Sequence, residues 1–196
     1  MEKRDLILKA AIECFTNYGY SKTTMSDIGR IVGMNKASLY YHFKDKLALY
    51  SAVVYNLRSE HMITLRNNLK SKTLAEQIIE FLKSEIDFSQ IIAMNYLSGN
   101  SEMSQNKDET QSVFQEIIAD DIKQVSAMIA NAVKKGELNN CDPVETARMI
   151  LMVSNGLLQV QCPLDMALSE REAGYKAVKH QIEQVIGLML KGLAPC

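Results

Sequence analysis

The chain has 196 residues, of which 47% are hydrophobic and 23% charged, with a formal net charge of −1. This composition indicates a globular protein with a sizeable core and excludes a disordered chain. No apolar run approaches the roughly 18 residues of a membrane-spanning helix, and the opening residues lack the layout of a secretory signal. The four scattered cysteines favour free, mostly buried thiols, with redox sensing by one of them as the alternative. We therefore expect a cytoplasmic protein with no cofactor, no metal ion and no membrane partner.

Helical periodicity runs through the whole sequence, and only three prolines and nine glycines interrupt it. The apolar positions predict a first helix over about 3–18. Gly19 ends it, because glycine adopts the left-handed conformation that terminates helices. A short second helix is predicted to begin after Thr24, which with Asp27 matches an acidic variant of the capping box. Gly33 terminates this second helix.

A third short helix is predicted directly after that glycine. Asn35 is a good N-cap for it, and Leu39 and Phe43, four residues apart, face the core. Asp45 is expected to cap a long helix over about 46–69. Two short helices joined by a three-residue step, after a first helix that supports them, have the layout of a helix-turn-helix unit.

The remaining sequence predicts further helices and no strand pair, so the expected fold class is all-α. Residues 98–108 are the most polar, loop-like stretch. The tetrapeptide Asp142-Pro143-Val144-Glu145 is a specific helix start, with an acidic N-cap and proline at the first helical position. The candidate helices cover about 74–87, 89–98, 110–135, 143–161 and 170–192.

The charge distribution and the third helix point to nucleic acid. Residues 1–50 carry eight basic and five acidic side chains, and a basic head is compatible with a nucleic-acid-binding module. In a helix-turn-helix unit, the N-terminal residues of the second helix reach base edges in the major groove. Lys46 adds a positive side chain to a helix N-terminus, where backbone amides already favour a phosphate.

At these positions the sequence resembles the DNA-binding domain of the TetR family of bacterial transcriptional regulators. The resemblance rests on an apolar-Gly turn, a small hydroxyl residue, Leu-Tyr, His-Phe and a Lys at fixed spacing, and it extends upstream to the Phe15, Tyr18, Gly19 and Tyr20 positions. It covers about the first quarter of the chain and departs mildly from the family pattern at Ala37, where many relatives carry Gly or Pro. The matching residues are Thr23-Thr24-Met25-Ser26-Asp27-Ile28 and Gly33-Met34-Asn35-Lys36-Ala37-Ser38-Leu39-Tyr40-Tyr41-His42-Phe43-Lys44-Asp45-Lys46.

The resemblance implies a DNA-binding domain over 1–46 and a helical ligand-binding and dimerisation domain over 47–196. It implies DNA contacts by Thr24, Ser26, Lys36, Ala37, Ser38, Tyr40, Tyr41, His42 and Lys46. Of these we expect Lys36 to bind a guanine, Ala37 to contact a thymine methyl, and Tyr40 and His42 to bind phosphates. One of the two tyrosines has packing between helices as an equal alternative, and His42 alone is more typical of a structural histidine.

The resemblance also implies a homodimer, a palindromic operator in double-stranded DNA, and a small-molecule effector. The last two helices resemble the family's dimerising pair, and their broad apolar faces suit that role, although completing a monomer core is the alternative. The expected interface residues are Ile150, Ser154, Leu157, Leu158, Gln161, Val178, Ile182, Val185, Ile186 and Met189. The pocket candidates, each of which has core packing as the more ordinary interpretation, are Phe81, Phe88, Met94, Tyr96, Phe114, Met128 and Met152.

The expected function is therefore a repressor that a small, lipophilic molecule releases from its operator. The region lacks tryptophan and clustered hydrogen-bonding side chains, which favours a lipophilic molecule over a sugar. An enzyme is disfavoured, because the sequence has no Gly-rich phosphate loop and no GxSxG motif. Two alternatives stay open: an activator, and an architectural DNA-binding protein that responds to no ligand.

Overall fold

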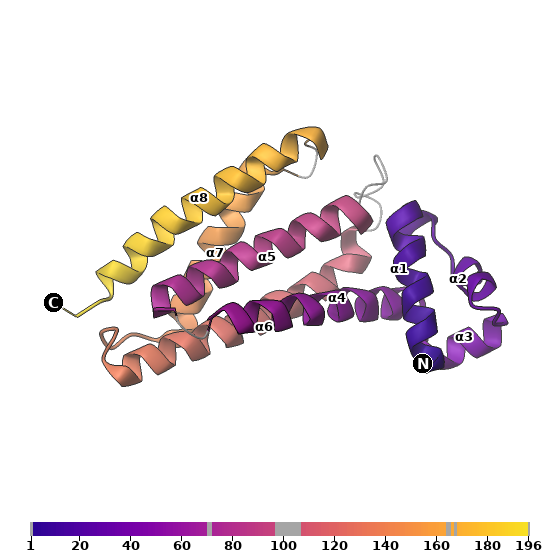
Figure 1. Cartoon of the computed structure of the whole chain (residues 1–196), viewed down its shortest axis with the longest axis horizontal. Helices are drawn as coiled ribbons and strands as arrows, with labels where there is room; N and C mark the ends of the chain where they lie inside the picture. The colour runs from indigo at the N-terminus through magenta and orange to yellow at the C-terminus, as the bar shows by residue number, and fades with distance from the viewer. Residues whose placement is uncertain (1, 70–71, 97–106, 164–165, 167, 196) are drawn as a thin grey trace. The chain divides into compact units, whose positions relative to one another are not determined.

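The computed structural model describes residues 2–69, 72–96, 107–163, 166 and 168–195, and only the backbone at 66–68, 93–96, 107–110 and 168–169. Over these residues the chain is all α-helical, as predicted, and Figure 1 shows its helices without any strand. They are α1 (Lys3–Lys22), α2 (Met25–Ile31), α3 (Lys36–His42), α4 (Lys46–Leu69), α5 (Leu74–Tyr96), α6 (Lys107–Lys135), α7 (Pro143–Gln161) and α8 (Leu168–Gly192).

The predicted bounds hold for α4 and α7 and are wrong in two places. A break between 87 and 89 is absent, because α5 continues through Phe88 and Ser89. Neither residue has the backbone cost of Gly or Pro in a helix, and Phe88 is buried. Of the predicted loop at 98–108, the part up to 106 lies outside the described residues, whereas Lys107 and Asp108 belong to α6.

The chain divides into two compact units. One comprises Met1–Met62 with Ser89–Phe114, and the other comprises Ile63–Phe88 with Gln115–Cys196. Helices α4, α5 and α6 therefore each contribute to both units. The predicted domain boundary after residue 46 stays a prediction.

An aromatic cluster fills the first unit beneath a kink in α1. The rings of Phe15, Tyr20 and Tyr50 are buried, with centroids 4.9–5.9 Å apart. The kink is at Gly19, which has a φ of 77°, so this glycine turns the chain as predicted, although one helical turn follows it. The buried Thr23 hydroxyl lies 2.7 Å from the carbonyl oxygen of Gly19 and fixes the kink.

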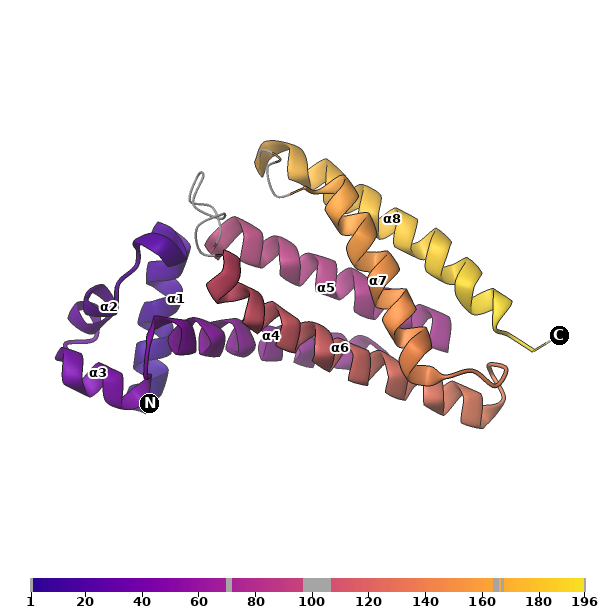
Figure 2. The same cartoon turned by 180° about the vertical axis from the view of Figure 1, so that it is seen from behind.

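In the second unit α7 and α8 pack against one another, as Figures 1 and 2 both show. Asp142 caps α7 as predicted, since its Oδ1 accepts hydrogen bonds from the amides of Val144 (2.9 Å) and Glu145 (3.1 Å). The two helices come close at Gly174 of α8, where an added Cβ would lie 2.5 Å from the carbonyl oxygen of Gln161. None of the helices in the described ranges is both long and apolar enough to span a membrane.

Candidate DNA-binding interface

The turn between α2 and α3 is a Schellman motif, which fixes where α3 begins. Gly33 has a φ of 66°, a left-handed conformation that favours glycine. The Met34 amide donates to the Gly29 carbonyl (2.8 Å) and the Gly33 amide to the Arg30 carbonyl (3.3 Å), the bond pair that defines this motif. The backbone of the turn therefore folds back onto α2.

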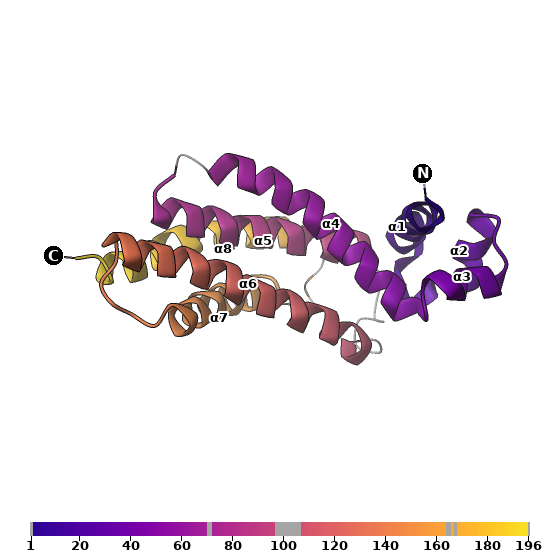
Figure 3. The ribbon, with the colours of Figure 1, turned by 90° about the horizontal axis from the view of Figure 1, so that it is seen from below.

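Gly29 allows this close approach. A Cβ built on it would lie 3.0 Å from the Met34 carbonyl oxygen and 3.8 Å from Cδ2 of Leu39. An alanine at this position would press on the Met34 carbonyl of the turn and would reach ordinary van der Waals contact with Leu39 of α3. The crossing of the two helices, visible beside α1 in Figure 3, thus depends on two glycines four residues apart.

Helix α3 has one buried and one exposed side. Its predicted N-cap is confirmed, because Oδ1 of Asn35 accepts a hydrogen bond from the Ser38 amide (2.8 Å). Leu39 and the C-cap residue Phe43 are buried, as predicted. The remaining side chains are exposed or, for His42, half-buried, and they include every predicted contact of this helix: Lys36, Ala37, Ser38, Tyr40, Tyr41 and His42.

The exposed side of α3 combines a cation with aromatic rings. Tyr41 has 88% of its surface exposed and Tyr40 has 40%. The Lys36 ammonium lies 5.7 Å from the centroid of the Tyr40 ring, and the rings of Tyr41 and His42 meet edge to face at 5.4 Å. A basic and hydrogen-bonding surface of this kind suits phosphates and base edges.

The N-terminus of α2 has the predicted capping box. The Thr24 hydroxyl and amide donate to Oδ2 of Asp27 (2.6 and 3.1 Å), and the Asp27 amide donates to the Thr24 hydroxyl (3.2 Å). These hydrogen bonds from Thr24, followed by the nearby Arg30 charge, hold the pKa of Asp27 below its usual range. Thr24 and Ser26, both predicted DNA contacts, are exposed at this helix start.

Lys46 is engaged within the protein. It is half-buried, its Nζ donates to the Tyr20 carbonyl oxygen (3.0 Å), and it lies 4.2 Å from the centroid of the Tyr20 ring. The first turn of α4 is thereby joined to the turn that follows the α1 kink. A phosphate contact by Lys46 stays a prediction.

Three residues of this region escaped the sequence reasoning. Arg4 places its guanidinium 5.1 Å above the Phe43 ring, so it adds a positive charge at the end of α3. Gly29 and Thr23 set the turn and the kink as described above. The spacing of Gly29 and Gly33 was a usable signal, whereas nothing in the sequence places Arg4 near a residue 39 positions away.

The predicted pocket residues divide by burial. Phe81 and Phe88 of α5 are buried, and Met128 of α6 is half-buried, all within the second unit. Phe114 is half-buried in the first unit, while Met152 has 67% of its surface exposed. The side chains of Met94 and Tyr96 lie outside the described residues.

The predicted interface residues also divide. Five pack inside the protomer and offer no surface to a partner: Ile150, Ser154, Val178, Ile182 and Ile186. The other five are half-buried on α7 and α8: Leu157, Leu158, Gln161, Val185 and Met189. The sequence pattern did not single out the apolar side chains that are most exposed on these helices, namely Val144, Met149, Met152, Val160 and Leu188.

Comparison with known proteins relates the N-terminal part of the chain to a family. Residues 7–53 match the model of bacterial regulatory proteins of the tetR family, a range that contains α2, α3 and the start of α4. The chain is 24% identical over 161 residues to the uncharacterised HTH-type transcriptional regulator YhgD of Bacillus subtilis, covering 81% of this chain and 83% of YhgD.

A second relative and a solved structure agree with that match. The negative transcriptional regulator IcaR of the biofilm operon icaADBC in Staphylococcus aureus is 36% identical over 80 residues, covering 40% of this chain and 43% of IcaR. The crystal structure of a transcriptional regulator from Cytophaga hutchinsonii superposes with a TM-score of 0.76 at 23% identity, covering 97% of this chain and 98% of that chain. At this identity the structural likeness concerns the fold.

Proposed function

The chain belongs to the TetR family of helix-turn-helix transcriptional regulators, and from this premise we propose that it is a homodimeric repressor. In this proposal it binds a palindromic operator, and a small apolar molecule releases it. The observation that carries the proposal is the α2–α3 unit. Its Schellman turn and Gly29 hold α3 with Leu39 and Phe43 inside and Lys36 outside.

The exposed side chains of α2, α3 and the residues beside them have separate roles in the proposal. Lys36 donates to O6 and N7 of a guanine, and Ala37 contacts a thymine methyl. The hydroxyls of Ser26 and Ser38 bind phosphates, because they lie at helix N-termini where the amides already favour an anion. Thr24 does the same when its hydroxyl proton turns from Asp27 to the phosphate. Tyr40, Tyr41, His42 and Lys46 bind the backbone and fix the position of α3 on the duplex.

Repression is proposed rather than activation because IcaR is named a negative regulator. A homodimer is proposed because a palindromic operator has two half-sites about 34–36 Å apart, and each half-site takes the helix-turn-helix of one protomer. The exposed apolar side chains on α7 and α8 suit a self-association surface, since aliphatic and Met side chains gain by leaving water. They comprise Val144, Met149, Met152 and Val160 of α7 and Leu188 of α8.

An apolar effector is proposed for the interior of the second unit. Phe81 and Phe88 are buried there, and Met128 offers a flexible side chain that adapts to a ligand. Met152 is left out because it is exposed. By linkage, an effector that weakens DNA binding must itself be bound more weakly, by the same factor, when DNA is saturating. A screen of small apolar molecules for loss of the DNA complex, followed by this reciprocal titration, tests the effector.

The DNA proposal is tested by selecting bound duplexes from a random pool of 30-base-pair sequences. We expect a palindrome to be enriched, with two protomers per duplex by analytical ultracentrifugation. Fluorescence anisotropy at about 150 mM salt then compares this duplex with a scrambled one, and specific binding should exceed non-specific binding at least 10³-fold. An unenriched pool, with equal binding to both duplexes, would identify an architectural DNA-binding protein instead.

Lys36 provides the residue-level test. Lys36→Ala should cost about 1–3 kcal/mol of binding to the selected sequence and relax the preference at one base in each half-site. Lys44→Ala is the matched control, because Lys44 is exposed in the same unit and has no predicted base contact. An equal loss of affinity for scrambled DNA would show that Lys36 binds a phosphate rather than a base.

A further inference from the structure

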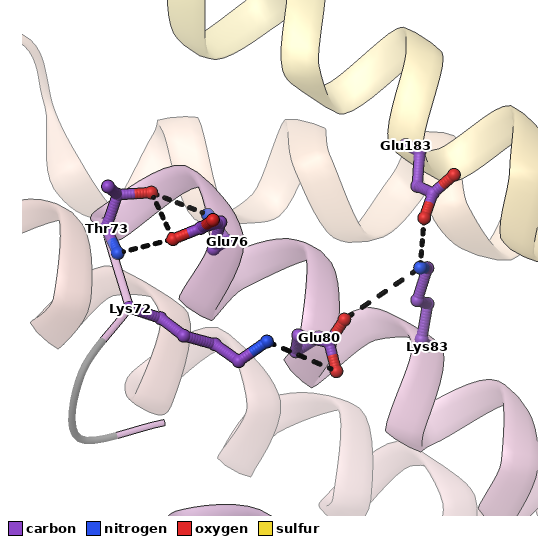
Figure 4. Close-up of polar contacts among 6 residues, drawn as sticks. All are labelled: Lys72, Thr73, Glu76, Glu80, Lys83 and Glu183. Atoms are coloured by element: carbon purple, nitrogen blue, oxygen red, sulfur yellow. Dashed lines mark hydrogen bonds and ion pairs between the residues drawn. The ribbon is translucent and has the colours of Figure 1, made fainter. Parts of the chain in front are cut away.

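Two ion pairs of opposite polarity connect α5 with α8 in the second unit. Lys83 of α5 pairs with Glu183 of α8, and Asp87 of α5 pairs with Lys179 of α8. Lys83 also lies 3.9 Å from Glu80 on its own helix. Figure 4 shows the Lys83–Glu183 contact as the link between the two helices. All four paired side chains are partly covered, with 22–47% of their surfaces exposed, so water screens them less than fully exposed charges.

The two pairs belong to a single antiparallel register. From Lys83 to Asp87 α5 advances four residues, and from Glu183 to Lys179 α8 goes back four, so the pairs lie about one helical turn apart on each helix. Figures 1 and 2 show the two helices running in opposite directions. Along this contact the charges alternate: positive then negative on α5, facing negative then positive on α8.

The apolar side of α8 does little to define this register. Val178, Ile182, Ile186 and Leu190 recur every four residues, and all four are buried. If α8 slid along α5 by one turn, about 5.4 Å, three of the four aliphatic side chains would be replaced by one of similar size, and only an end position would receive a smaller residue, Gly174 or Ala194. Swaps of this kind are tolerated in protein cores at small cost.

The charges, in contrast, distinguish the native register from both neighbours. A slide of one turn in one direction brings Lys83 opposite Lys179. A slide in the other direction brings Asp87 opposite Glu183. Each slide therefore loses both ion pairs and creates a like-charge contact, which is the way charged positions select the register in coiled coils.

We propose that the alternating pairs Lys83–Glu183 and Asp87–Lys179 are a register lock that holds the α7–α8 hairpin at one position on α5. The hairpin moves as one body, because Gly174 of α8 lies directly against the backbone of Gln161 at the end of α7. Without the lock, α7 and α8 would occupy positions on α5 that differ by one helical turn. The proposal depends neither on DNA binding nor on an effector.

The alternation itself can be removed while both pairs are kept. In the half-swap Lys83→Glu/Glu183→Lys, both paired positions on α5 are acidic and both paired positions on α8 are basic. The native pairing therefore persists, but each one-turn slide also brings opposite charges together. In the full swap, which adds Asp87→Lys and Lys179→Asp, alternation is restored with reversed signs. The full swap is a matched control, since it contains the same changes beside Glu80 and His180 as the half-swap.

Spin labels on Glu76→Cys of α5 and Ala173→Cys of α8, both exposed positions, report the register. In the native register these sites are separated by roughly 25 Å along the helix axes at 1.5 Å rise per residue, so a slide changes the distance by about 5 Å. Cys141 and Cys196 are replaced by Ser. Cys14 and Cys162 are kept, because burial raises the pKa of both thiols and slows labelling. Labelled protein is diluted tenfold with unlabelled protein to suppress distances between protomers.

Pulsed electron resonance should give one distance for the parent and the full swap, and an additional distance shifted by about 5 Å for the half-swap. One unshifted distance in all three proteins would overturn the proposal, because packing alone would then define the register. Should the first half-swap not fold, the reciprocal half-swap Asp87→Lys/Lys179→Asp tests the same point. It places two basic side chains on α5 and two acidic ones on α8.

Discussion

The α2–α3 and α7–α8 pairs both consist of consecutive helices with a glycine at their contact, but different interactions hold them. Helices α2 and α3 have seven residues each, too few for stability through packing alone. Side-chain caps at Thr24 and Asn35 therefore begin each helix. Helices α7 and α8 have 19 and 25 residues, and buried aliphatic side chains hold them together. The short helices thus depend on individual capping hydrogen bonds, whereas the long helices depend on the apolar surface area that they bury.

The two contact glycines sharpen this difference. At Gly174 an added Cβ would lie 2.5 Å from the Gln161 carbonyl oxygen and 2.6 Å from Sγ of Cys162. At Gly29 the nearest atom would be 3.0 Å away. The long pair is thus the more tightly packed, while the short pair is the one whose geometry decides where α3 points.

The largest expected effect on folding is that of Gly174→Ala. The new Cβ overlaps a backbone oxygen that cannot move without displacing the end of α7, so we expect a loss of about 1–3 kcal/mol in the free energy of unfolding. Urea denaturation measures it. Gly187→Ala is the control on the same helix, because nothing lies within 4 Å of its Cβ position and alanine favours a helix by about 1 kcal/mol. Equal stabilities of the two variants would mean that α7 and α8 are not in close contact at Gly174.

Gly29→Ala should affect DNA binding more than stability. The gain in helix propensity, about 1 kcal/mol, offsets much of the pressure on the Met34 carbonyl, so the free energy of unfolding should change little. The turn must nevertheless shift by a few tenths of an ångström, and this shift changes the orientation of α3. We expect operator affinity to fall about tenfold, the equivalent of 1.4 kcal/mol. Anisotropy and urea denaturation on the same preparation separate the two effects, and unchanged affinity would show that α3 tolerates the shift.

Lys46→Gln should lower DNA affinity by a smaller factor and for every sequence alike. If the ammonium binds a phosphate while retaining its bond to the Tyr20 carbonyl, its removal flattens the slope of log K against log salt by about 0.9. Lys44→Gln, two residues away and exposed, should leave the slope unchanged. A slope that stays constant in Lys46→Gln, with lower thermal stability, would instead make Lys46 a residue that positions α4 on the α1 kink.

Local signals explain which parts of the fold the sequence predicts. The caps at Thr24, Asn35 and Asp142 link residues two or three positions apart, so the sequence contains both partners side by side. The same pattern at Thr73 and Glu76 was overlooked, although it begins α5 in the same way. The break predicted near Phe88 was wrong because no breaking residue supports it.

Contacts between distant residues explain most of what the sequence leaves open. The Arg4–Phe43 contact and the Lys83–Glu183 pair join positions 39 and 100 residues apart, and no periodicity indicates them. Periodicity does identify the apolar side of α8. It does not say whether Ile182 meets its own protomer or a partner, and in the structure Ile182 is buried within the protomer.

The smallest expected effect, and the closest comparison of the two units, concerns their acidic capping boxes. Hydrogen bonds from Thr24 lower the pKa of Asp27, and those from Thr73 lower the pKa of Glu76 (Figure 4). Each carboxylate therefore stabilises the fold above its unfolded pKa, about 3.9 for Asp and 4.3 for Glu. That contribution is lost as the pH falls through the lower folded-state pKa. The stability difference between the parent and Asp27→Asn should thus be fully present at pH 7, begin to decrease below about pH 4, and vanish only below the folded-state pKa, as urea denaturation over this range would measure.

Glu76→Gln should show the same dependence on pH, because both boxes stabilise the first turn of a helix by the same hydrogen bonds. The two variants should differ in DNA binding. Asp27 orders the start of α2, where Thr24 and Ser26 are proposed to bind phosphate, so Asp27→Asn should weaken DNA binding at pH 7, while Glu76→Gln should not. If both variants bound DNA as tightly as the parent, the N-terminus of α2 would be a structural cap only, and the proposed contacts would be confined to α3 and the residues that follow it.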